Sequence, residues 1–534
     1  MIFRILVTVC LAFTINVHPS DAQNQSLSSE ARKVAGALYA IASFYVDSVN
    51  NEKLAEDAIR GMLEKLDPHS TYMDKEETKE MTEPLQGNFD GIGIQFNMLT
   101  DTVYIIQVIP GGPSEKVGLL AGDRIIEVND TVIAGVQMKT TDIMKRLRGP
   151  KGSEVRVKVS RQGSPELLEF KITRGKIPVY SLDAAYMADP TTGYIKLNRF
   201  AATSAEEFRE ALAKLKRQGM KHLILDLQSN GGGYLNAAID LADEFLDKNK
   251  LIVYTEGDKQ RREESKATSA GDFEEGRLVI LIDEASASAS EIVSGAVQDW
   301  DRGVLIGRRS FGKGLVQRPI PMPDGSMIRL TVARYYTPTG RCIQKPYVNG
   351  DKEQYEQDLI NRFDHGELMH ADSIHFADSL KYKTLEKGRT VYGGGGIMPD
   401  IFVPVDTART TKYHRELVAK GAIYRASMNY IDSHRKELKK AYPTIADFKA
   451  KFEVNDEIRN DLRSLADAEK IAFNETEYRA SLPLIELQLK ALIARDLFDM
   501  NEYFLIINDI NESLQQALKL INDPKRYEEV LSRQ

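Results

Sequence analysis

The sequence predicts a multidomain α+β protein, an expectation that rests on its length and on the way its apolar pattern changes. The chain has 534 residues, which exceeds the usual size of one domain, so two or more domains are expected. A helical pattern gives way to short β-rich runs, then to alternating strands and helices, and finally to a long helical region. Hydrophobic residues make up 42% and charged residues 28%, values typical of a soluble globular protein.

These changes of pattern set the expected domain boundaries. Residues 23–84 form an N-terminal helical region, because apolar residues recur there at helical spacing. Residues 85–174 form a β-rich domain with glycine and proline punctuation. Residues 175–405 form an α/β core that carries a polar insertion at 345–392. Residues 406–534 form a C-terminal helical region, which either closes over the core or makes a dimer.

The N-terminus predicts export. In residues 1–22, Arg4 precedes an apolar run from Ile5 to Val17, and Ser-Asp-Ala supplies small residues for cleavage, as in a signal peptide. A bacterial-type periplasm or cell envelope is the expected destination. Removal of this segment leaves Cys342 as the one cysteine, so the mature chain cannot form an intrachain disulfide. The net charge of −7 argues against a nucleic-acid-binding protein, which would carry a basic surface.

The segment after one expected buried strand, Leu278–Ile282, carries serines at the start of an expected helix, Ser290–Trp300. Serines at helix starts are usually caps. The positive end of a helix also stabilises negative charge, such as a tetrahedral oxyanion, so a nucleophile would suit this place. The residues alone do not choose among the candidates, which are Ser286, Ser288 and Ser290.

A lysine follows in the segment Phe311–Gln317, which reads FGKGLVQ. Lys313 lies between glycines and beside apolar segments, so it can be brought into the core and stripped of water. Complete burial lowers a lysine pKa by as much as roughly 3 to 5 units, which makes the amine a general base near neutral pH. A serine with a neutral lysine is a known variant of the serine hydrolase arrangement.

The two segments together resemble the active-site region of the C-terminal processing peptidases, or tail-specific proteases, which are serine endopeptidases with a Ser/Lys dyad. The family segment S-A-S-A-S-E stands at Ser286–Glu291, and F-G-K-G-x-V-Q stands at Phe311–Gln317. The family lysine follows its nucleophile by 25 positions, and 313 − 288 = 25. The resemblance therefore implies that Ser288 is the nucleophile, that Lys313 is the base, and that Gln317 orients the lysine.

A glycine-rich loop, Ser229–Gly233, follows another expected buried strand. Its backbone N–H groups can approach a reacting carbonyl closely because glycine has no side chain. The resemblance implies that N–H groups at Gly232 and Gly233, together with that of Ala289, form the oxyanion hole. Gln228 stands where the family usually has an arginine, which leaves the contact of that side chain open.

The β-rich domain is similar to a PDZ domain in the order of its motifs, which are DGIGI at 90–94, GPSEKVGL at 112–119 and AGDRII at 121–126. Such a domain binds the terminal carboxylate of a peptide through backbone N–H groups, and the peptide then extends the sheet. An expected helix, Thr140–Leu147, completes the groove. The alternative is a β-rich packing domain without a ligand. The implied carboxylate-binding loop consists of Gly91, Ile92, Gly93 and Ile94.

Other polar segments carry weaker expectations. Lys248–Gly276 is largely charged and is expected to be a solvated excursion or a lid. His69 follows a proline in an expected turn, where a solvated histidine without a role is expected. The histidines of the 345–392 insertion lie five apart without an H-E-x-x-H motif, which favours a surface insertion over a metal site. No metal, nucleotide or other cofactor is implied.

These features predict an exported serine endopeptidase that binds an apolar or unstructured protein C-terminus through its PDZ domain. It would cleave that substrate with the Ser/Lys dyad, in C-terminal processing or degradation. The expected partners are substrates with free apolar C-termini, a second copy of the chain through the terminal helical regions, and an adaptor or activator protein. Two alternatives stay open: a non-catalytic PDZ receptor or scaffold with a protease-like core, and a Ser-His-Asp hydrolase, although the sequence has no G-x-S-x-G elbow.

Overall fold

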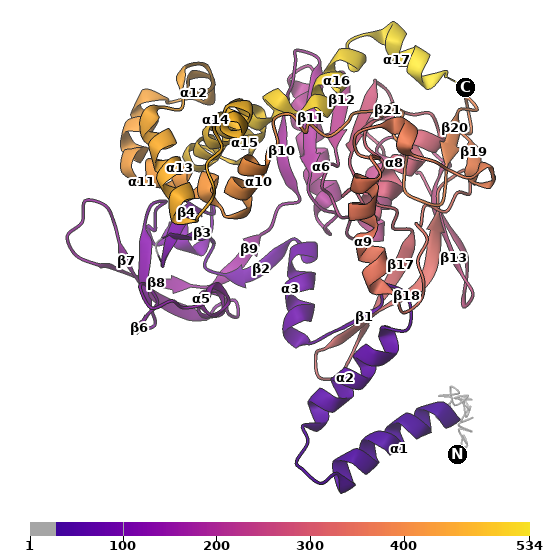
Figure 1. The fold of residues 1–534 in the computed structure, drawn as a ribbon, viewed down its shortest axis with the longest axis horizontal. Coiled ribbons are helices and arrows are strands. Elements are labelled where there is room, and N and C mark those ends of the chain that lie inside the picture. The colour runs from indigo at the N-terminus through magenta and orange to yellow at the C-terminus, as the bar shows by residue number, and fades with distance from the viewer. Residues whose placement is uncertain (1–27, 100, 534) are drawn as a thin grey trace, which may run out of the picture. The chain divides into compact units, whose positions relative to one another are not determined.

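The computed structural model describes residues 28–99 and 101–533 and divides into two compact units, residues 1–63 and 64–534. The predicted signal peptide lies outside the described residues. In the first unit, helices α1 (Ser29–Phe44) and α2 (Asn51–Leu63) are joined by a short connection (Figure 1). None of the described helices combines the length and the apolar content that crossing a bilayer requires.

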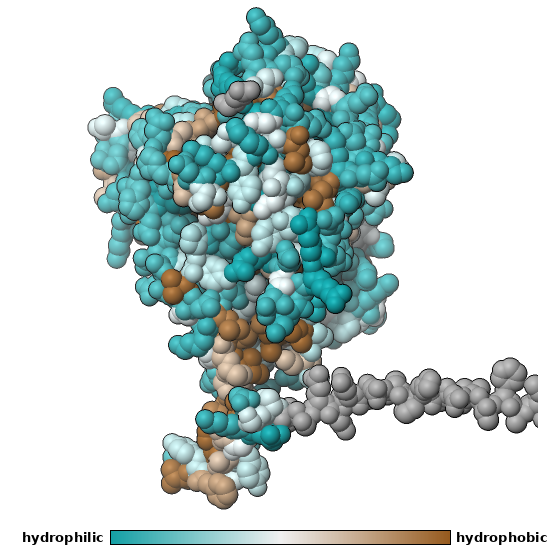
Figure 2. All heavy atoms as spheres, turned by 90° about the vertical axis from the view of Figure 1, so that its right-hand side faces the viewer, coloured by the Kyte–Doolittle hydropathy of each residue, from teal (hydrophilic) through white to brown (hydrophobic). Residues whose placement is uncertain are grey.

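Helix α1 leaves large apolar side chains exposed. None of its residues is fully buried. Figure 2 shows a mostly hydrophilic surface with hydrophobic atoms gathered in the lower part of the view. Isolated exposed apolar residues are normal, but a contiguous group of them is typical of a surface that binds something. The exposed apolar residues of α1 and its C-terminal end are Val34, Tyr39, Ile41, Phe44, Tyr45 and Val46.

The β-rich domain is a twisted sheet with the order β3-β4-β5-β7-β8, in which β6 also pairs with β5. Helix α5 (Thr140–Leu147) packs on it and has the predicted bounds, and α4 (Pro113–Lys116) is a single turn. Strand β3 lies at the sheet edge, since β4 is its one partner in the described chain. The strands are β3 (Ile94–Leu99), β4 (Thr102–Val108), β5 (Arg124–Val128), β6 (Thr131–Val132), β7 (Glu154–Ser160) and β8 (Leu168–Thr173).

The core is built on a sheet with the order β10-β11-β12-β15-β16-β21. Neighbouring strands are parallel except β10 and β11, which are antiparallel. The inner strands read as continuous apolar runs because helices cover both faces of the sheet. The strands are β10 (Leu182–Met187), β11 (Thr192–Leu197), β12 (His222–Asp226), β15 (Leu278–Ile282), β16 (Val304–Gly307) and β21 (Ile401–Phe402).

Different parts of the chain cover the two faces of this sheet. On one face, α6 (Ser204–Arg217), α7 (Leu235–Asp243) and α8 (Ala289–Asp299) pack against alternate strand residues. On the other face, α16 (Glu512–Ile521) and α17 (Pro524–Leu531) cover the intervening residues (Figure 1). The end of the C-terminal region therefore closes over the core.

The rest of the C-terminal region forms its own helical bundle around a separate apolar cluster. The 406–534 region is thus helical, as predicted. Its first part forms a separate bundle, and its last two helices cover the core sheet. The bundle helices are α10 (Lys412–Ala419), α11 (Ala422–Ala441), α12 (Ile445–Lys451), α13 (Asp456–Ala468), α14 (Glu475–Leu497) and α15 (Met500–Ile507).

A second sheet lies beside the core and has the order β1-β18-β13-β14, with β17 paired to β18. The segment expected to be a solvated excursion forms the β13–β14 hairpin of this sheet, so that expectation is wrong for its backbone. Strand β14 is polar because its side chains are exposed at the sheet edge. The strands are β1 (Thr71–Met73), β13 (Leu251–Gly257), β14 (Gln260–Lys266), β17 (Leu315–Pro321) and β18 (Met327–Tyr336).

Short elements connect these parts. Helix α3 (Lys75–Gln86) leads to β2 (Asn88–Gly91), which pairs with β9 (Gly175–Pro178) at the base of the β-rich domain. The 345–392 insertion holds α9 (Lys352–Asp364) and the hairpin of β19 (Lys381–Lys383) and β20 (Thr390–Tyr392).

The insertion is more than the expected surface element. The Arg362 side chain of α9 is buried, and its guanidinium donates to the carbonyls of Arg309 (2.7 Å) and Ser310 (3.1 Å). Those carbonyls lie directly before the segment that holds Lys313. The polar composition of the insertion did not predict that α9 packs on the core, because arginine is mostly found at protein surfaces.

Candidate active site

The structure brings the predicted reactive residues to one cavity of about 350 Å³, named here the serine–lysine cavity. Its residues follow the carboxyl ends of strands β12, β15 and β16, which lie at one edge of the parallel sheet. Side chains distant in the sequence meet there because parallel strands end together. The predicted residues that line it are Gly232, Gly233, Ser288, Ala289, Lys313 and Gln317.

Hydrogen bonding distinguishes the three candidate serines. The fully buried hydroxyl of Ser286 donates to the carbonyl of Leu227 at 2.8 Å, and that of Ser290 donates to the carbonyl of Asn230 at 2.8 Å. Ser288 is half-buried and lines the cavity, and its hydroxyl donates to no acceptor within the described residues. Ser286 and Ser290 thus hold the turn together, while the Ser288 hydroxyl is free to donate a proton.

The backbone of Ser288 is strained. Its φ of 55° and ψ of −111° lie outside the usual regions for a residue with a side chain. Such outliers cost free energy and persist only where the surroundings impose them, most often at functional sites. The Ser288 N–H donates to the Glu291 carboxylate at 2.7 Å, which helps to hold this conformation.

The buried carboxylate of Glu291 joins the serine turn to the lysine segment. It also accepts hydrogen bonds from the Ser310 hydroxyl (2.5 Å), the Gly312 N–H (2.7 Å) and the Lys313 N–H (2.9 Å). Burial raises the pKa of this carboxyl, and the hydrogen bonds offset part of that rise. The sequence analysis gave Glu291 no role, although it ends the recognised segment at Ser286–Glu291.

A tyrosine makes a second connection between the same two segments. The Tyr335 hydroxyl of β18 lies within hydrogen-bond distance of the carbonyl of Ser288, at 3.1 Å, and of the carbonyl of Lys313. Burial raises the pKa of Tyr335 well above its ordinary value, so the hydroxyl stays a donor. The backbones of Ser288 and Lys313 are therefore fixed relative to each other from two sides.

The surroundings of Lys313 favour its neutral form. Burial, and then the positive charge of Arg329, lower the pKa of Lys313 to about 8, while Glu291 and Asp67 oppose the shift. Roughly a tenth of the amine is then unprotonated at pH 7. A lysine in this state can accept a proton near neutral pH, which an ordinary solvated lysine cannot.

Gln317 lies on β17 and lines the cavity, but its amide points elsewhere. Its Nε2 donates to the carbonyl of Leu315 (3.1 Å) and to the Thr331 hydroxyl (3.4 Å) of the paired strand β18. No hydrogen bond joins Gln317 to Lys313 in the part of the chain that the structure describes. That the glutamine orients the lysine therefore stays a prediction.

The turn before β1 adds residues that the sequence analysis set aside. The Asp67 carboxylate accepts from the Thr331 hydroxyl at 2.8 Å, and thereby holds the side chain to which Gln317 donates. His69 is not solvated as expected: it packs edge-on against Tyr355 of α9, with 3.0 Å between Nε2 and the hydroxyl. Burial, followed by the charge of Lys313, lowers the pKa of His69 to about 3, so its ring is neutral.

Of the three predicted oxyanion donors, one N–H group already donates a hydrogen bond within the loop, and two have no acceptor in the described chain. The Gly232 N–H donates to Asn230 Oδ1 at 2.9 Å. The N–H groups of Gly233 and Ala289 have no acceptor among residues 28–99 and 101–533. A Cβ placed on Gly232 would lie 2.8 Å from Ser288 Cβ and 3.0 Å from Ala289 N, and its φ is +99°. Only glycine fits there, because the loop lies directly against the serine turn.

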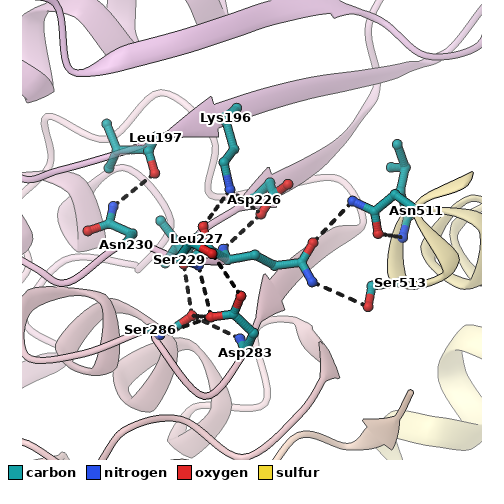
Figure 3. Close-up of polar contacts among 12 residues, drawn as sticks. Lys196, Leu197, Asp226, Leu227, Ser229, Asn230, Asp283, Ser286, Asn511 and Ser513 are labelled. Atoms are coloured by element: carbon teal, nitrogen blue, oxygen red, sulfur yellow. Dashed lines mark hydrogen bonds and ion pairs between the residues drawn. The ribbon is translucent and has the colours of Figure 1, made fainter. Parts of the chain in front are cut away.

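Figure 3 shows how the glycine loop is held between the core and the C-terminal helices. Asp283 accepts from the Ser229 N–H at 2.8 Å and lies between Ser229 and Ser286. The Gln228 side chain turns away from the cavity, accepts from Asn511 Nδ2 at 3.1 Å and approaches the Ser513 hydroxyl of α16 at 3.5 Å. The sequence left open what the Gln228 side chain contacts. In the structure it contacts the C-terminal region.

A second cavity, of about 590 Å³, lies between β3 and α5 and is named here the β3–α5 groove. The loop residues Ile92, Gly93 and Ile94 line this groove, whereas Gly91 pairs with Gly175 in β2–β9 and is not among the lining residues. Further lining residues are Gln95, Phe96, Asn97 and Met98 of β3, Thr140, Met144 and Leu147 of α5, and Phe89, Arg148 and Tyr424.

No group of three or more His, Cys, Asp or Glu side chains suited to a metal ion occurs in the described chain. The residues that line the serine–lysine cavity are mainly apolar or cationic, which does not resemble the carboxylate and imidazole sets that hold divalent metals.

Profiles of known protein families match most of the chain. Residues 191–354 match Peptidase family S41, residues 91–172 match the PDZ domain, and residues 13–77 match the N-terminal domain of the activating protease CtpB. Residues 413–499 match a family of unknown function. These matches follow the order of the β-rich domain, the α/β core and the helical bundle.

Individual relatives agree with these matches. A carboxy-terminal-processing protease of Bartonella bacilliformis is 38% identical over 305 residues, which cover 56% of this chain and 69% of the relative. The carboxy-terminal processing protease CtpA of Bacillus subtilis is 33% identical over 399 residues, which cover 73% of this chain and 82% of the relative. The solved structure of a photosystem II D1 C-terminal processing protease is 29% identical, with 60% of this chain and 91% of that chain covered and a TM-score of 0.34.

Proposed function

Because the chain belongs to the carboxy-terminal processing proteases, serine-type peptidases of family S41 with a PDZ domain, we propose that Ser288 and Lys313 are its catalytic dyad. One observation carries this proposal. Ser288 is the one of the three candidate serines that lines the cavity, and the same cavity holds a buried lysine with a lowered pKa. Glu291 and Tyr335 fix the two segments relative to each other.

The reaction follows from this arrangement. The neutral amine of Lys313 takes the proton of the Ser288 hydroxyl as its oxygen attacks the scissile carbonyl. The oxyanion that forms accepts hydrogen bonds from the N–H groups of Ala289 and Gly233. When the tetrahedral intermediate collapses, the C–N bond breaks and Lys313 gives its proton to the leaving amine. Water, deprotonated by the same lysine, then attacks the acyl carbonyl, the ester C–O bond breaks, and Lys313 returns the proton to Ser288 Oγ.

The β3–α5 groove is proposed to bind the substrate by its C-terminus. Strand β3 is a sheet edge with free backbone groups, so an extended peptide can pair with it. Its carboxylate would meet the N–H groups of the Ile92–Ile94 loop, and apolar lining residues such as Met144 and Leu147 favour an apolar terminal side chain.

Export and assembly are proposals with separate tests. Cleavage after Ala22 would place the mature protein in a bacterial-type periplasm or cell envelope, and N-terminal sequencing of the protein from fractionated cells measures this. The exposed apolar side chains of α1 support pairing with a second copy of the chain, and light scattering of wild type and a Tyr39→Ser, Phe44→Ser variant tests it. An adaptor or activator protein stays a prediction.

The function is tested by mass spectrometry of an unfolded protein with an apolar C-terminus, incubated with the mature protein or its Ser288→Ala variant. Fragments from the wild type alone support the dyad. If neither protein cuts the substrate, the result favours the alternative of a non-catalytic PDZ receptor or scaffold. Cutting by both would point to a different nucleophile, and single replacement of each mature histidine then tests the Ser-His-Asp alternative.

A further inference from the structure

The β3–α5 groove is built from two distant parts of the chain. All but one of its lining residues belong to the segment from Phe89 to Arg148. The exception is Tyr424 of α11, which lies 327 positions after Asn97, the residue that it contacts. The helical bundle therefore supplies part of the wall of a groove that belongs otherwise to the PDZ domain.

Tyr424 is held firmly in this place. Its hydroxyl accepts a hydrogen bond from the Asn97 side-chain amide of β3. Its ring packs against an apolar cluster that both domains share, which comprises Tyr104 and Ile106 of β4 and Met428 of α11. The guanidinium of Arg495 lies 5.3 Å from the ring centroid. The ring is thus a fixed surface beside the groove.

The position of Asn97 shows which peptide residue this surface would meet. An added strand runs antiparallel to β3 with its carboxylate at the loop that ends at Ile94, and the two strands then match residue for residue. Since 97 − 94 = 3, Asn97 lies opposite the third residue before the terminal one. Ile94, Phe96 and Met98 pack onto the PDZ core, so Asn97 points to the other face of the sheet, where Tyr424 lies.

We propose that Tyr424 is a specificity-determining residue for the substrate C-terminus, and that it selects the residue three before the terminal one. This inference rests on the proposed binding of peptides to the β3–α5 groove. The aromatic ring offers apolar contact area, so a bulky apolar side chain is favoured at that position.

The same domain interface offers a matched control. Arg124 of β5 forms an ion pair with Asp432 of α11, two helical turns from Tyr424, and neither residue lines the groove. A change at Asp432 weakens the contact between the PDZ domain and the helical bundle without altering the groove wall. It therefore separates a direct role of Tyr424 from a role in docking the two domains.

The test measures the binding of fluorescent six-residue peptides to the full-length Ser288→Ala protein, which cannot consume them. Two peptides share an apolar terminal residue and differ only at the third residue before it, which is leucine in one and glycine in the other. Fluorescence anisotropy gives Kd for each peptide with the parent and with Tyr424→Ala, Tyr424→Phe and Asp432→Asn. Asn97→Ala removes the same Asn97–Tyr424 contact from the PDZ side, and it replaces Tyr424→Ala in the test if that variant does not fold.

We expect the parent to bind the leucine peptide about fivefold to tenfold more tightly than the glycine peptide, and Tyr424→Ala to abolish that preference. Tyr424→Phe keeps the ring and the preference, and Asp432→Asn leaves both affinities within about twofold.

An unchanged preference in Tyr424→Ala would overturn the inference. Equal weakening of both peptides would also overturn it, because the tyrosine would then only hold the domain. If the parent binds neither peptide, the groove does not take C-termini and the binding part of the proposed function fails first.

Discussion

The serine–lysine cavity takes its reactive groups from one domain, whereas the β3–α5 groove takes its wall from two. In the cavity, strand ends of a single sheet present Ser288 and Lys313, and buried groups such as Glu291 tie them together. In the groove, an open sheet edge meets Tyr424 of a bundle from the far end of the chain. In the proposed function, catalysis therefore depends on one rigid scaffold, whereas substrate selection depends on the packing of two domains.

The comparison predicts that changes in the cavity have the largest effects. Lys313→Ala removes the base and should lower kcat by about a thousandfold or more, since losing one member of such a set removes most of its catalysis. Lys313→Arg should not restore activity, because a guanidinium stays protonated. Peptide affinity of the β3–α5 groove serves as the control and should stay unchanged. Near-normal kcat in Lys313→Ala would exclude the dyad.

Glu291→Gln should have the second-largest effect and lower kcat by about a hundredfold. The amide cannot accept all the hydrogen bonds from Ser288, Ser310, Gly312 and Lys313, so the serine turn and the lysine segment lose their fixed distance. Glu284→Gln is the matched control, because the Glu284 carboxylate pairs with Arg308 at 2.6 Å and accepts no hydrogen bond from Ser286–Glu291 or Phe311–Gln317 within the described residues. Equal activities of the two variants would contradict the positioning role of Glu291.

Gln228→Ala should have a smaller effect, about threefold to tenfold on kcat with KM unchanged. The side chain links the glycine loop to Asn511 of α16, and its loss loosens the loop that offers an oxyanion donor. Asn511→Ala should give the same loss, and the double variant should lose no more than either single one. Additive effects would show that Gln228 acts without α16.

Arg329→Met should shift a pH profile more than it changes the maximal rate. The guanidinium lowers the pKa of Lys313, so its removal raises that pKa and moves the rise of kcat/KM to higher pH. The shift is measured on the same peptide substrate as the wild type. An unchanged pH profile would mean that the charge of Arg329 does not act on Lys313, and a shift to lower pH would contradict the predicted sign.

The domain order and most of the candidate site could be predicted from the sequence, because local segments carry the residues concerned. The segments around Ser288 and Lys313 led, through the family resemblance, to the proposed dyad, and the motif order led to a PDZ domain before the α/β core. The predicted bounds of the helix Thr140–Leu147 agree with the structure. Glycine spacing and strand-end position are local properties, so one sequence reveals them.

Contacts made by packing were not predictable. His69 was expected to be solvated, yet α9 covers it, and nothing in the turn sequence shows that a helix from the insertion lies there. The sequence does not reveal the packing of Arg362 and Tyr424, because their partners are distant along the chain. The β13–β14 hairpin looked like an excursion because only one of its strands is apolar.

The dependence of kcat/KM on pH tests the Ser288–Lys313 dyad most directly. The base is active when deprotonated, so activity should rise with pH, reach half its maximum near pH 8 and then level off. That result would match a buried lysine. A midpoint near 6.5 or lower would indicate a histidine base and contradict the account.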